Sequence, residues 1–192
     1  MASRLKKKVI PELNQAYQKV LLWFFSYPEH EISLNNLSRA VKISKTTAKS
    51  VVEQLVADGF LKKEVLGKIW RIFCNQSHVY NYSRKISYNL MMIYESGIIE
   101  EIHNLIQNSR TIILFGSYRK GDDTEKSDID IAVEILGNED IKLHQLGVIR
   151  VFGYRNNVTV NLHIFSRNKI DLNLFTNIAN GIALEGFLEV RP

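Results

Sequence analysis

Residues 111–135, TIILFGSYRKGDDTEKSDIDIAVEI, constrain the fold most, because two apolar segments flank a glycine and a charged loop. The apolar run 112–115 predicts a buried strand that stops where the glycine follows. Acidic and apolar residues then alternate over residues 128–133, which predicts a second strand. Because successive side chains point to opposite faces of a strand, Asp128 and Asp130 are expected side by side, with the isoleucines facing the core.

Two carboxylates at such close quarters repel each other unless a cation lies between them. A hard divalent cation such as Mg²⁺ prefers oxygen ligands and often bridges carboxylates to substrate phosphates. Upstream, Gly116 allows the backbone to approach a phosphate, and the amides of Ser117 and its neighbours would donate to an anion if they open a helical turn. Arg119 and Lys120 fit either neutralisation of a triphosphate or an ordinary surface role. The stretch therefore predicts a site for metal and a nucleoside triphosphate.

The same stretch argues against two other motifs. Gly116 and Gly121 are followed by Asp122 rather than by Lys and Ser or Thr, so this is not a P-loop. The acidic cluster that follows lacks the glycine and the ligand order of an EF-hand loop. Asp122, Asp123 and Glu125 are instead expected to form a solvated turn.

The segments 115–117 (FGS) and 127–130 (SDID) resemble the signature of the DNA polymerase β-like nucleotidyltransferases, and most of all the minimal nucleotidyltransferases of archaea and bacteria. The resemblance covers roughly residues 98–190. It implies a small domain with a mixed sheet and two Mg²⁺ ions held by Asp128 and Asp130. It also implies in-line transfer of a nucleoside monophosphate from an NTP to a hydroxyl, with release of pyrophosphate. In the family the acceptor is a small molecule, a nucleic acid end or a tyrosine of a partner protein.

Members of that family normally carry a third carboxylate on a later strand. The matching segment here is residues 158–165, VTVNLHIF, in which the expected acidic position is Asn161. Asparagine offers a neutral carbonyl to a metal but no charge, and it cannot act as a base. His163 lies two residues on and fits either a polar neighbour of the site or a structural histidine. This departure leaves triphosphate binding in place and weakens the metal that would activate the nucleophile.

Charge is divided unevenly along the chain. Residues 1–76 contain 13 Lys/Arg and 6 Asp/Glu, a balance of +7. Residues 77–192 contain 12 Lys/Arg and 14 Asp/Glu, a balance of −2, within the overall net charge of +5. Such an asymmetry predicts a polyanionic partner for the first part of the chain.

Apolar spacing in this first part predicts three helices followed by a hairpin. The first helix is expected over residues 13–24. Ser33 is placed to cap a second helix over residues 34–41, and Ser44 to cap a third. Two short apolar segments around Gly67 predict a β-hairpin.

This order of elements resembles a winged helix-turn-helix domain over about residues 10–75. The resemblance implies that the helix after Ser44 enters the major groove of double-stranded DNA and that the hairpin contacts the DNA backbone. Helix-turn-helix modules also serve as protein-interaction domains, so both interpretations remain open. The residues expected to contact DNA are Lys45, Thr46, Thr47, Lys49, Ser50, Lys62, Lys63, Lys68 and Arg71.

The sequence thus predicts an α+β protein with a winged helix-turn-helix domain at residues 1–76, a connecting helix at 77–97 and a mixed-sheet nucleotidyltransferase-like domain at 98–192. The connecting helix, rich in apolar residues and tyrosine, fits either a homodimer contact or packing between the two domains. The longest unbroken apolar run, residues 20–25, is far shorter than the ~20 residues of a membrane span. A single cysteine, Cys74, excludes an intrachain disulfide. We therefore expect a cytoplasmic protein with no membrane partner.

Two functions fit these features. The first is an enzyme that carries a DNA-binding domain and transfers a nucleoside monophosphate to a hydroxyl acceptor. The second is a non-enzymatic transcriptional regulator whose degenerate nucleotidyltransferase domain senses nucleotide or mediates protein contacts. Asn161 is the residue that separates the two.

Overall fold

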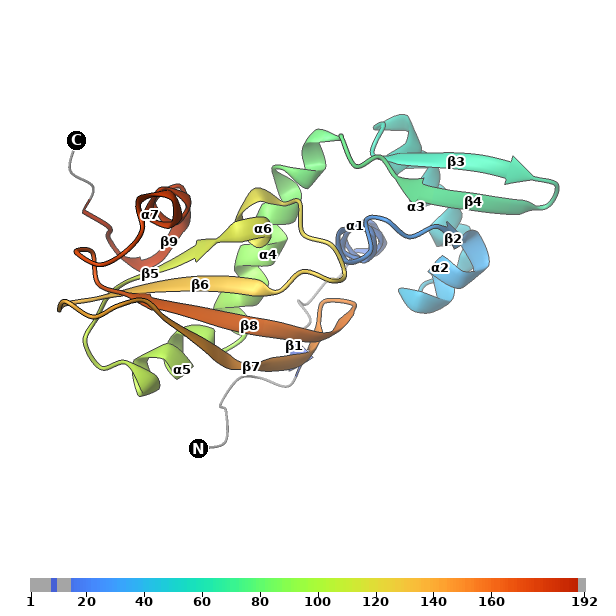
Figure 1. The fold of residues 1–192 in the computed structure, drawn as a ribbon. Helices are drawn as coiled ribbons and strands as arrows, with labels where there is room; N and C mark the ends of the chain where they lie inside the picture. Colours follow the sequence, from blue (N-terminus) through green and yellow to red (C-terminus); the bar gives the residue numbers. More distant parts are fainter. Residues whose placement is uncertain (1–7, 10–14, 190–192) are drawn as a thin grey trace.

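The computed structural model describes residues 8–9 and 15–189 and combines helices with two sheets (Figure 1). Its first part contains β1 (Lys8–Val9), α1 (Ala16–Ser26), β2 (Ile32–Ser33), α2 (Leu34–Ala40), α3 (Lys45–Ala57), β3 (Leu61–Leu66) and β4 (Ile69–Cys74). The 3-10 turn η1 (Val79–Asn81) and α4 (Arg84–Glu95) connect the two parts. The second part contains α5 (Ile98–Leu105), β5 (Ser109–Phe115), α6 (Gly116–Lys120), β6 (Ile129–Ile135), β7 (Lys142–Phe152), β8 (Arg155–Phe165), α7 (Leu172–Ala179) and β9 (Ile182–Gly186).

The larger sheet is mixed, with the strand order β1-β7-β8-β6-β5-β9. β5 and β6 pair antiparallel, which confirms the two adjacent strands predicted from residues 111–135. β6 and β8 pair parallel. In this register Asp130 lies opposite Phe115 on one side and opposite Asn161 on the other. Asp130 and Asn161, both singled out in the sequence, are therefore cross-strand neighbours.

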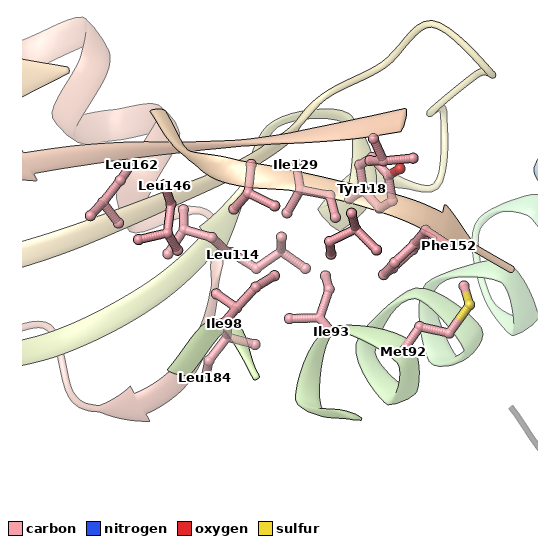
Figure 2. Close-up of a cluster of buried hydrophobic side chains, with 14 of the residues drawn as sticks. Met92, Ile93, Ile98, Leu114, Tyr118, Ile129, Leu146, Phe152, Leu162 and Leu184 are labelled. Carbon is pink, nitrogen blue, oxygen red and sulfur yellow. The ribbon is translucent and has the colours of Figure 1, made fainter. Parts of the chain in front are cut away.

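The main hydrophobic core fills the face of this sheet that α4 and α5 cover (Figure 2). Its members include Met92, Ile93, Ile98, Leu114, Tyr118, Ile129, Leu146, Phe152, Leu162 and Leu184. On the opposite face, Ile178 of α7 packs with Phe115, Ala132 and Phe165. Since side chains alternate along a strand, Asp130 and Asn161 project to this second face, the one that carries α7.

In the first part, the predicted helices and hairpin are confirmed. Ser33 Oγ accepts the Asn36 N–H at 3.3 Å at the start of α2, and Ser44 Oγ accepts the Thr47 N–H at 3.0 Å at the start of α3. Caps of this kind stabilise a helix by about 1 kcal/mol each. β3 and β4 pair antiparallel around a turn at Gly67, and β2 completes a small three-stranded sheet.

The prediction of one continuous connecting helix from residue 77 is wrong. The chain first forms η1, and α4 begins only at Arg84. Asn81 explains the interruption, because its Nδ2 donates to the carbonyls of Asn75, Gln76 and His78 and so fixes a turn. The loop after α6 also packs against this turn, since a Cβ on Gly121 would lie 1.9 Å from the Asn81 carbonyl oxygen.

The two parts of the chain share packing. β1 pairs parallel with β7, so residues 8–9 belong to the larger sheet. Leu22 of α1 belongs to the main core, although most buried residues of α1 belong to the core of the first part. The ring of Phe25 in α1 also packs against that of Tyr88 in α4, with 5.5 Å between the ring centroids. Of the two interpretations of the connecting helix, these contacts favour packing between the two parts. Among residues 8–9 and 15–189, no helix has both the length and the apolar character needed to cross a membrane.

Candidate nucleotide and metal site

β5 ends at Phe115, and Gly116 then turns the chain into the short helix α6. Gly116 has φ +73°, in the left-handed region that side chains rarely adopt. A Cβ at this position would also lie 2.8 Å from Asp130 Oδ2. Backbone conformation and close approach therefore both require glycine here, directly beside a predicted metal ligand.

The two predicted carboxylates meet Asn161. Asp128 is exposed and lies just before β6, and Asp130 is the second residue of β6 and is partly exposed. Asn161 Nδ2 lies 3.3 Å from Asp128 Oδ2 and 3.5 Å from Asp130 Oδ1. In this arrangement the amide donates to both carboxylates and partly offsets their repulsion. Rotation of the amide by about 180° would present its carbonyl oxygen to a cation instead.

His163 is the next polar residue on the same face of β8. Its Nε2 lies 3.6 Å from Asp130 Oδ1, and its ring packs edge-on against Phe115 with 4.9 Å between ring centroids. Within the part of the chain that the structure describes, its buried Nδ1 has no hydrogen-bond partner. His163 is thus a neighbour of the carboxylates, which was one of the two roles expected for it.

The donor set fits a magnesium site only in part. Asp128, Asp130 and Asn161 offer oxygen atoms, the ligands that Mg²⁺ prefers. In the residues described, no three His, Cys, Asp or Glu side chains are grouped so that they could hold a metal ion by themselves. Two carboxylates therefore suit an ion that also takes oxygens from a bound phosphate, as Mg²⁺ commonly does in nucleotide sites.

A cavity of about 270 Å³ opens next to Gly116, between α6 and α7. Arg119 and Lys120, for which the sequence left open either neutralisation of a triphosphate or a surface role, both line this cavity. Its other lining residues are Phe115, Leu174, Asn177 and Asn180. The cavity thus combines positive charge with a glycine at which the backbone is accessible.

The prediction of a fully solvated acidic turn after α6 is wrong for Asp123. Asp122 is exposed as expected, but only 2% of Asp123 is accessible to solvent. Glu125 is partly buried, with its Oε1 3.3 Å from His30 Nε2. The turn is buried at Asp123 because cationic and amide side chains from α4 and β8 bind its carboxylate. These partners are distant in the sequence.

Residues 98–185 match the family model Polymerase beta, Nucleotidyltransferase. The match begins at the first residue of α5, ends in β9 and contains Gly116, Asp128 and Asp130. The mixed sheet and its helices fit a domain of this family, which supports the nucleotidyltransferase resemblance for this part of the chain. Comparison with curated proteins found no match.

A buried polar cluster, which the sequence patterns did not predict, lies in the loop that leads to the candidate site. Lys85 and Asn89 of α4 and Arg155 of β8 surround Asp123, and all four residues are at most 5% exposed. The buried face of α4 contains Lys85, Asn89 and Met92, whereas Tyr94 is exposed. Lys85, Asn89 and Met92 fall at i, i+4 and i+7, the spacing of residues on one face of a helix. Two of these three residues are polar, so the sequence did not mark this face as buried.

The predicted DNA-contacting residues gather around the start of α3 and the hairpin. Lys45, Thr46, Thr47, Lys49 and Ser50 are all exposed, and the Thr47 hydroxyl also lies 2.7 Å from Ser44 Oγ as part of the helix cap. A groove of about 340 Å³ separates these residues from the hairpin. The groove is lined by Ser33, Leu34, Asn35, Lys45, Lys49, Lys68, Ile69 and Trp70.

Cations on the hairpin differ in their availability. Lys62 and Lys68 are exposed, and Lys63 Nζ lies 4.0 Å from the centroid of the Trp70 ring. Arg71 donates to both carboxylate oxygens of Glu31 and, at 3.0 Å, to Glu64. These two acids offset the charge of Arg71, so the lysines carry most of the positive charge of the hairpin.

Proposed function

We propose that this protein transfers a nucleoside monophosphate from an NTP to a hydroxyl acceptor through residues 98–185. One observation carries the proposal: the backbone of Gly116 lies against the carboxylate of Asp130, in a region that matches a nucleotidyltransferase family model. A phosphate chain that passes over the glycine would reach a cation held by the carboxylates. Such a juxtaposition is what phosphoryl-type transfer requires of a protein, namely positioning and charge neutralisation.

The roles of the residues follow from their positions. Asp128 and Asp130 would hold Mg²⁺, and Asn161 would contribute its neutral carbonyl oxygen. When bound, two such ions would supply Lewis-acid stabilisation of the transferred phosphoryl group and of the attacking oxygen. Arg119 and Lys120 would offset the charge of the triphosphate in the cavity beside Gly116, and the Ser117 amide would donate to one of its oxygens.

A second candidate function rests on Asn161. Its amide bridges the two carboxylates and so stabilises the site without metal. It also replaces the third carboxylate, which would help to hold the metal that activates the nucleophile. That combination favours a domain that binds Mg²⁺ and an NTP but transfers slowly or not at all. The protein would then act as a nucleotide-responsive regulator.

We further propose that the first part of the chain binds double-stranded DNA. The support is the cluster of exposed lysines at the start of α3 and on the hairpin, of which Lys45, Lys49 and Lys68 line the same groove. Lysines of this kind act through phosphate contacts and counterion release, so the interaction would be strongly dependent on salt. Arg71 is left out of this proposal because Glu31 and Glu64 already pair with it.

Calorimetric titration of Mg²⁺ and each NTP into the full-length protein tests the nucleotide site. Binding is expected to require the metal and to be lost in the double variant Asp128→Asn, Asp130→Asn. A matched control is Asp122→Asn, Asp140→Asn, which removes two exposed carboxylates outside the site and should bind as the unaltered protein does. Absence of metal-dependent binding in the unaltered protein would refute both candidate functions of the site.

Incubation with an NTP labelled at the α-phosphate then separates the enzyme from the regulator. Transfer of label to a hydroxyl of an added small molecule, nucleic acid or protein, together with release of pyrophosphate, would establish the enzyme. Binding with no release of pyrophosphate in any acceptor mixture would favour the regulator.

A further inference from the structure

The loop between α6 and β6 contains Asp128 and leads directly to Asp130. It is anchored through one buried carboxylate, that of Asp123. Asn89 Nδ2 donates to Asp123 Oδ1 at 2.8 Å, and Lys85 Nζ lies 3.3 Å from the same oxygen. Lys85 also donates to the main-chain carbonyl of Asp123. Both partners belong to α4, so this helix fixes the first half of the loop.

Arg155 fixes the second half. Its Nη1 donates to Asp123 Oδ2 at 3.3 Å, and its Nη2 donates to the main-chain carbonyl of Ser127. Only 3% of Arg155 is accessible to solvent, and its guanidinium lies 5.1 Å from the centroid of the Tyr118 ring. A planar guanidinium holds two acceptors in a fixed relation, which a lysine ammonium cannot do. Arg155 therefore ties one end of the loop to the residue immediately before Asp128.

Burial makes the stability of this cluster depend on whether each charge keeps an opposite partner. Burial raises the pKa of the Asp123 carboxyl, while the charges of Lys85 and Arg155 oppose that rise. Two cations surround a single carboxylate, so Asp123 keeps a charged partner when Arg155 is replaced. Breaking a buried ion pair is costly when it leaves a charge unpaired. Because Lys85 remains, replacement of Arg155 is expected to loosen the loop without unfolding the protein.

We propose that Arg155 is a positioning residue, which orients Asp128 and Asp130 by holding the Ser127 carbonyl against buried Asp123. The inference rests on the proposed nucleotide site for its functional consequence, but the positioning itself is a property of the loop. Arg155 binds Asp123 and the Ser127 carbonyl rather than the side chains of Asp128 and Asp130, so it acts on these two residues through the backbone that precedes them. Partners that orient metal ligands commonly change metal affinity by about 10- to 100-fold when they are removed.

The test compares Arg155→Met and Arg155→Lys in the full-length protein, with Arg150→Met as the control. Arg150 is an exposed arginine on neighbouring β7, so its replacement removes the same charge at the surface of the same sheet. Two quantities are measured well below the unfolding temperature: hydrogen exchange of the amides of residues 124–130, and the Kd for Mg²⁺ and NTP. Arg155→Met should speed exchange in this segment and weaken binding by about 10- to 100-fold. Arg155→Lys keeps the positive charge but cannot bind Asp123 and the Ser127 carbonyl in the same fixed geometry. It should therefore show both effects to a smaller extent.

The outcomes separate this proposal from that of the site itself. Unchanged exchange over residues 124–130 in both variants would overturn the positioning role, whatever the nucleotide result. Faster exchange with unchanged Kd would show that Arg155 is only structural, and would also overturn it. If the unaltered protein binds no nucleotide, the proposed function fails, and exchange alone then decides whether Arg155 holds the loop. Should Arg155→Met fail to fold, Arg155→Lys carries both measurements.

Discussion

A Cβ placed on Gly116 would lie 2.8 Å from Asp130 Oδ2, so the glycine backbone and the carboxylate are in direct contact across β5 and β6. The contact joins the part of the chain suited to a phosphate with the part suited to a metal. Any side chain at residue 116 would either displace Asp130 or open the two strands at this point. The proposed site therefore depends on the absence of a side chain as much as on the carboxylates.

Gly116→Ala tests this dependence. We expect it to weaken binding of Mg²⁺ and NTP strongly and to destabilise the fold, since φ +73° alone costs about 1 kcal/mol for a side chain. Gly67→Ala is the matched control, because it has φ +61° but nothing within 4 Å of the added Cβ. Calorimetry should show that only the variant at residue 116 loses nucleotide binding, whereas thermal denaturation should show a loss of stability in both. Equal nucleotide affinities in the two variants would contradict the assignment.

Asn161→Asp should restore the missing charge on β8. Without metal, the new carboxylate repels Asp128 and Asp130 and loses two hydrogen bonds, so the free energy of unfolding should fall by about 1–2 kcal/mol. With metal, the added charge should raise affinity by about tenfold, which Mn²⁺ binding followed by electron paramagnetic resonance can measure. Asn156→Asp, an exposed position at the start of the same strand, is expected to change neither quantity.

The effect of Asn161→Asp on label transfer discriminates between the two candidate functions. A faster release of pyrophosphate would identify a weakened enzyme. A gain in metal affinity without any transfer would support the nucleotide-responsive regulator.

Reversal of charge at the start of α3 tests DNA binding. Lys45→Glu, Lys49→Glu should weaken binding to duplex DNA by about tenfold or more and reduce the slope of log K against log salt by about 2. Lys142→Glu, Lys169→Glu makes the same change of charge on exposed residues of the second part and should leave the slope unchanged. Fluorescence anisotropy at several salt concentrations gives both values. If both double variants bind alike, α3 does not contact DNA.

Cys74 provides a pH-dependent probe of the junction between the two parts. Burial raises the pKa of its thiol from 9.0 to about 12, and a hydrogen bond to Asn81 opposes that rise only partly. The folded protein therefore holds the proton more tightly than the unfolded chain does. This contribution to stability is fully present below pH 9 and is lost as the pH rises from about 9 towards 12.

Alkylation of Cys74 by iodoacetamide at pH 8 should consequently be much slower in the native protein than in urea. The native rate should rise when the turn η1 is loosened by Asn81→Ala, which removes the hydrogen bonds from Asn81 Nδ2 to the carbonyls of Asn75, Gln76 and His78. Ser77→Ala, at an exposed position nearby, serves as the control. Native and denatured rates that agree would show that the thiol is accessible.

Local patterns in the sequence pointed to several residues of the proposed site. Alternation over residues 128–133 predicted the strand that carries Asp130, whereas Asn161 was singled out through the family resemblance. The parallel register of β6 and β8 places these two residues opposite each other. Gly116 was found because an apolar run ends abruptly at a glycine. Capping by Ser33 and Ser44 was equally local, since each serine bonds an amide three residues ahead.

The buried cluster could not be found in the same way. Asp123 is separated from Lys85 by 38 residues and from Arg155 by 32, so its burial depends on tertiary packing. An acidic turn with no visible partner is normally solvated, and that default expectation failed here. The start of α4 was misjudged for a related reason, because the interruption at Asn81 arises from side-chain bonds rather than from a proline or glycine.

The end of α1 holds the tip of the β7–β8 hairpin, one residue before Arg155. Tyr154 donates its N–H to Ser26 Oγ at 3.4 Å, and its carbonyl accepts from the Tyr27 hydroxyl. Gly153 is equally enclosed, since a Cβ there would meet Ser26, Leu22 and Met92 within 3.5 Å. α1 is therefore shared by the two parts, and a chimaera that exchanges either of them would keep these contacts only if α1 and the β7–β8 hairpin stay together.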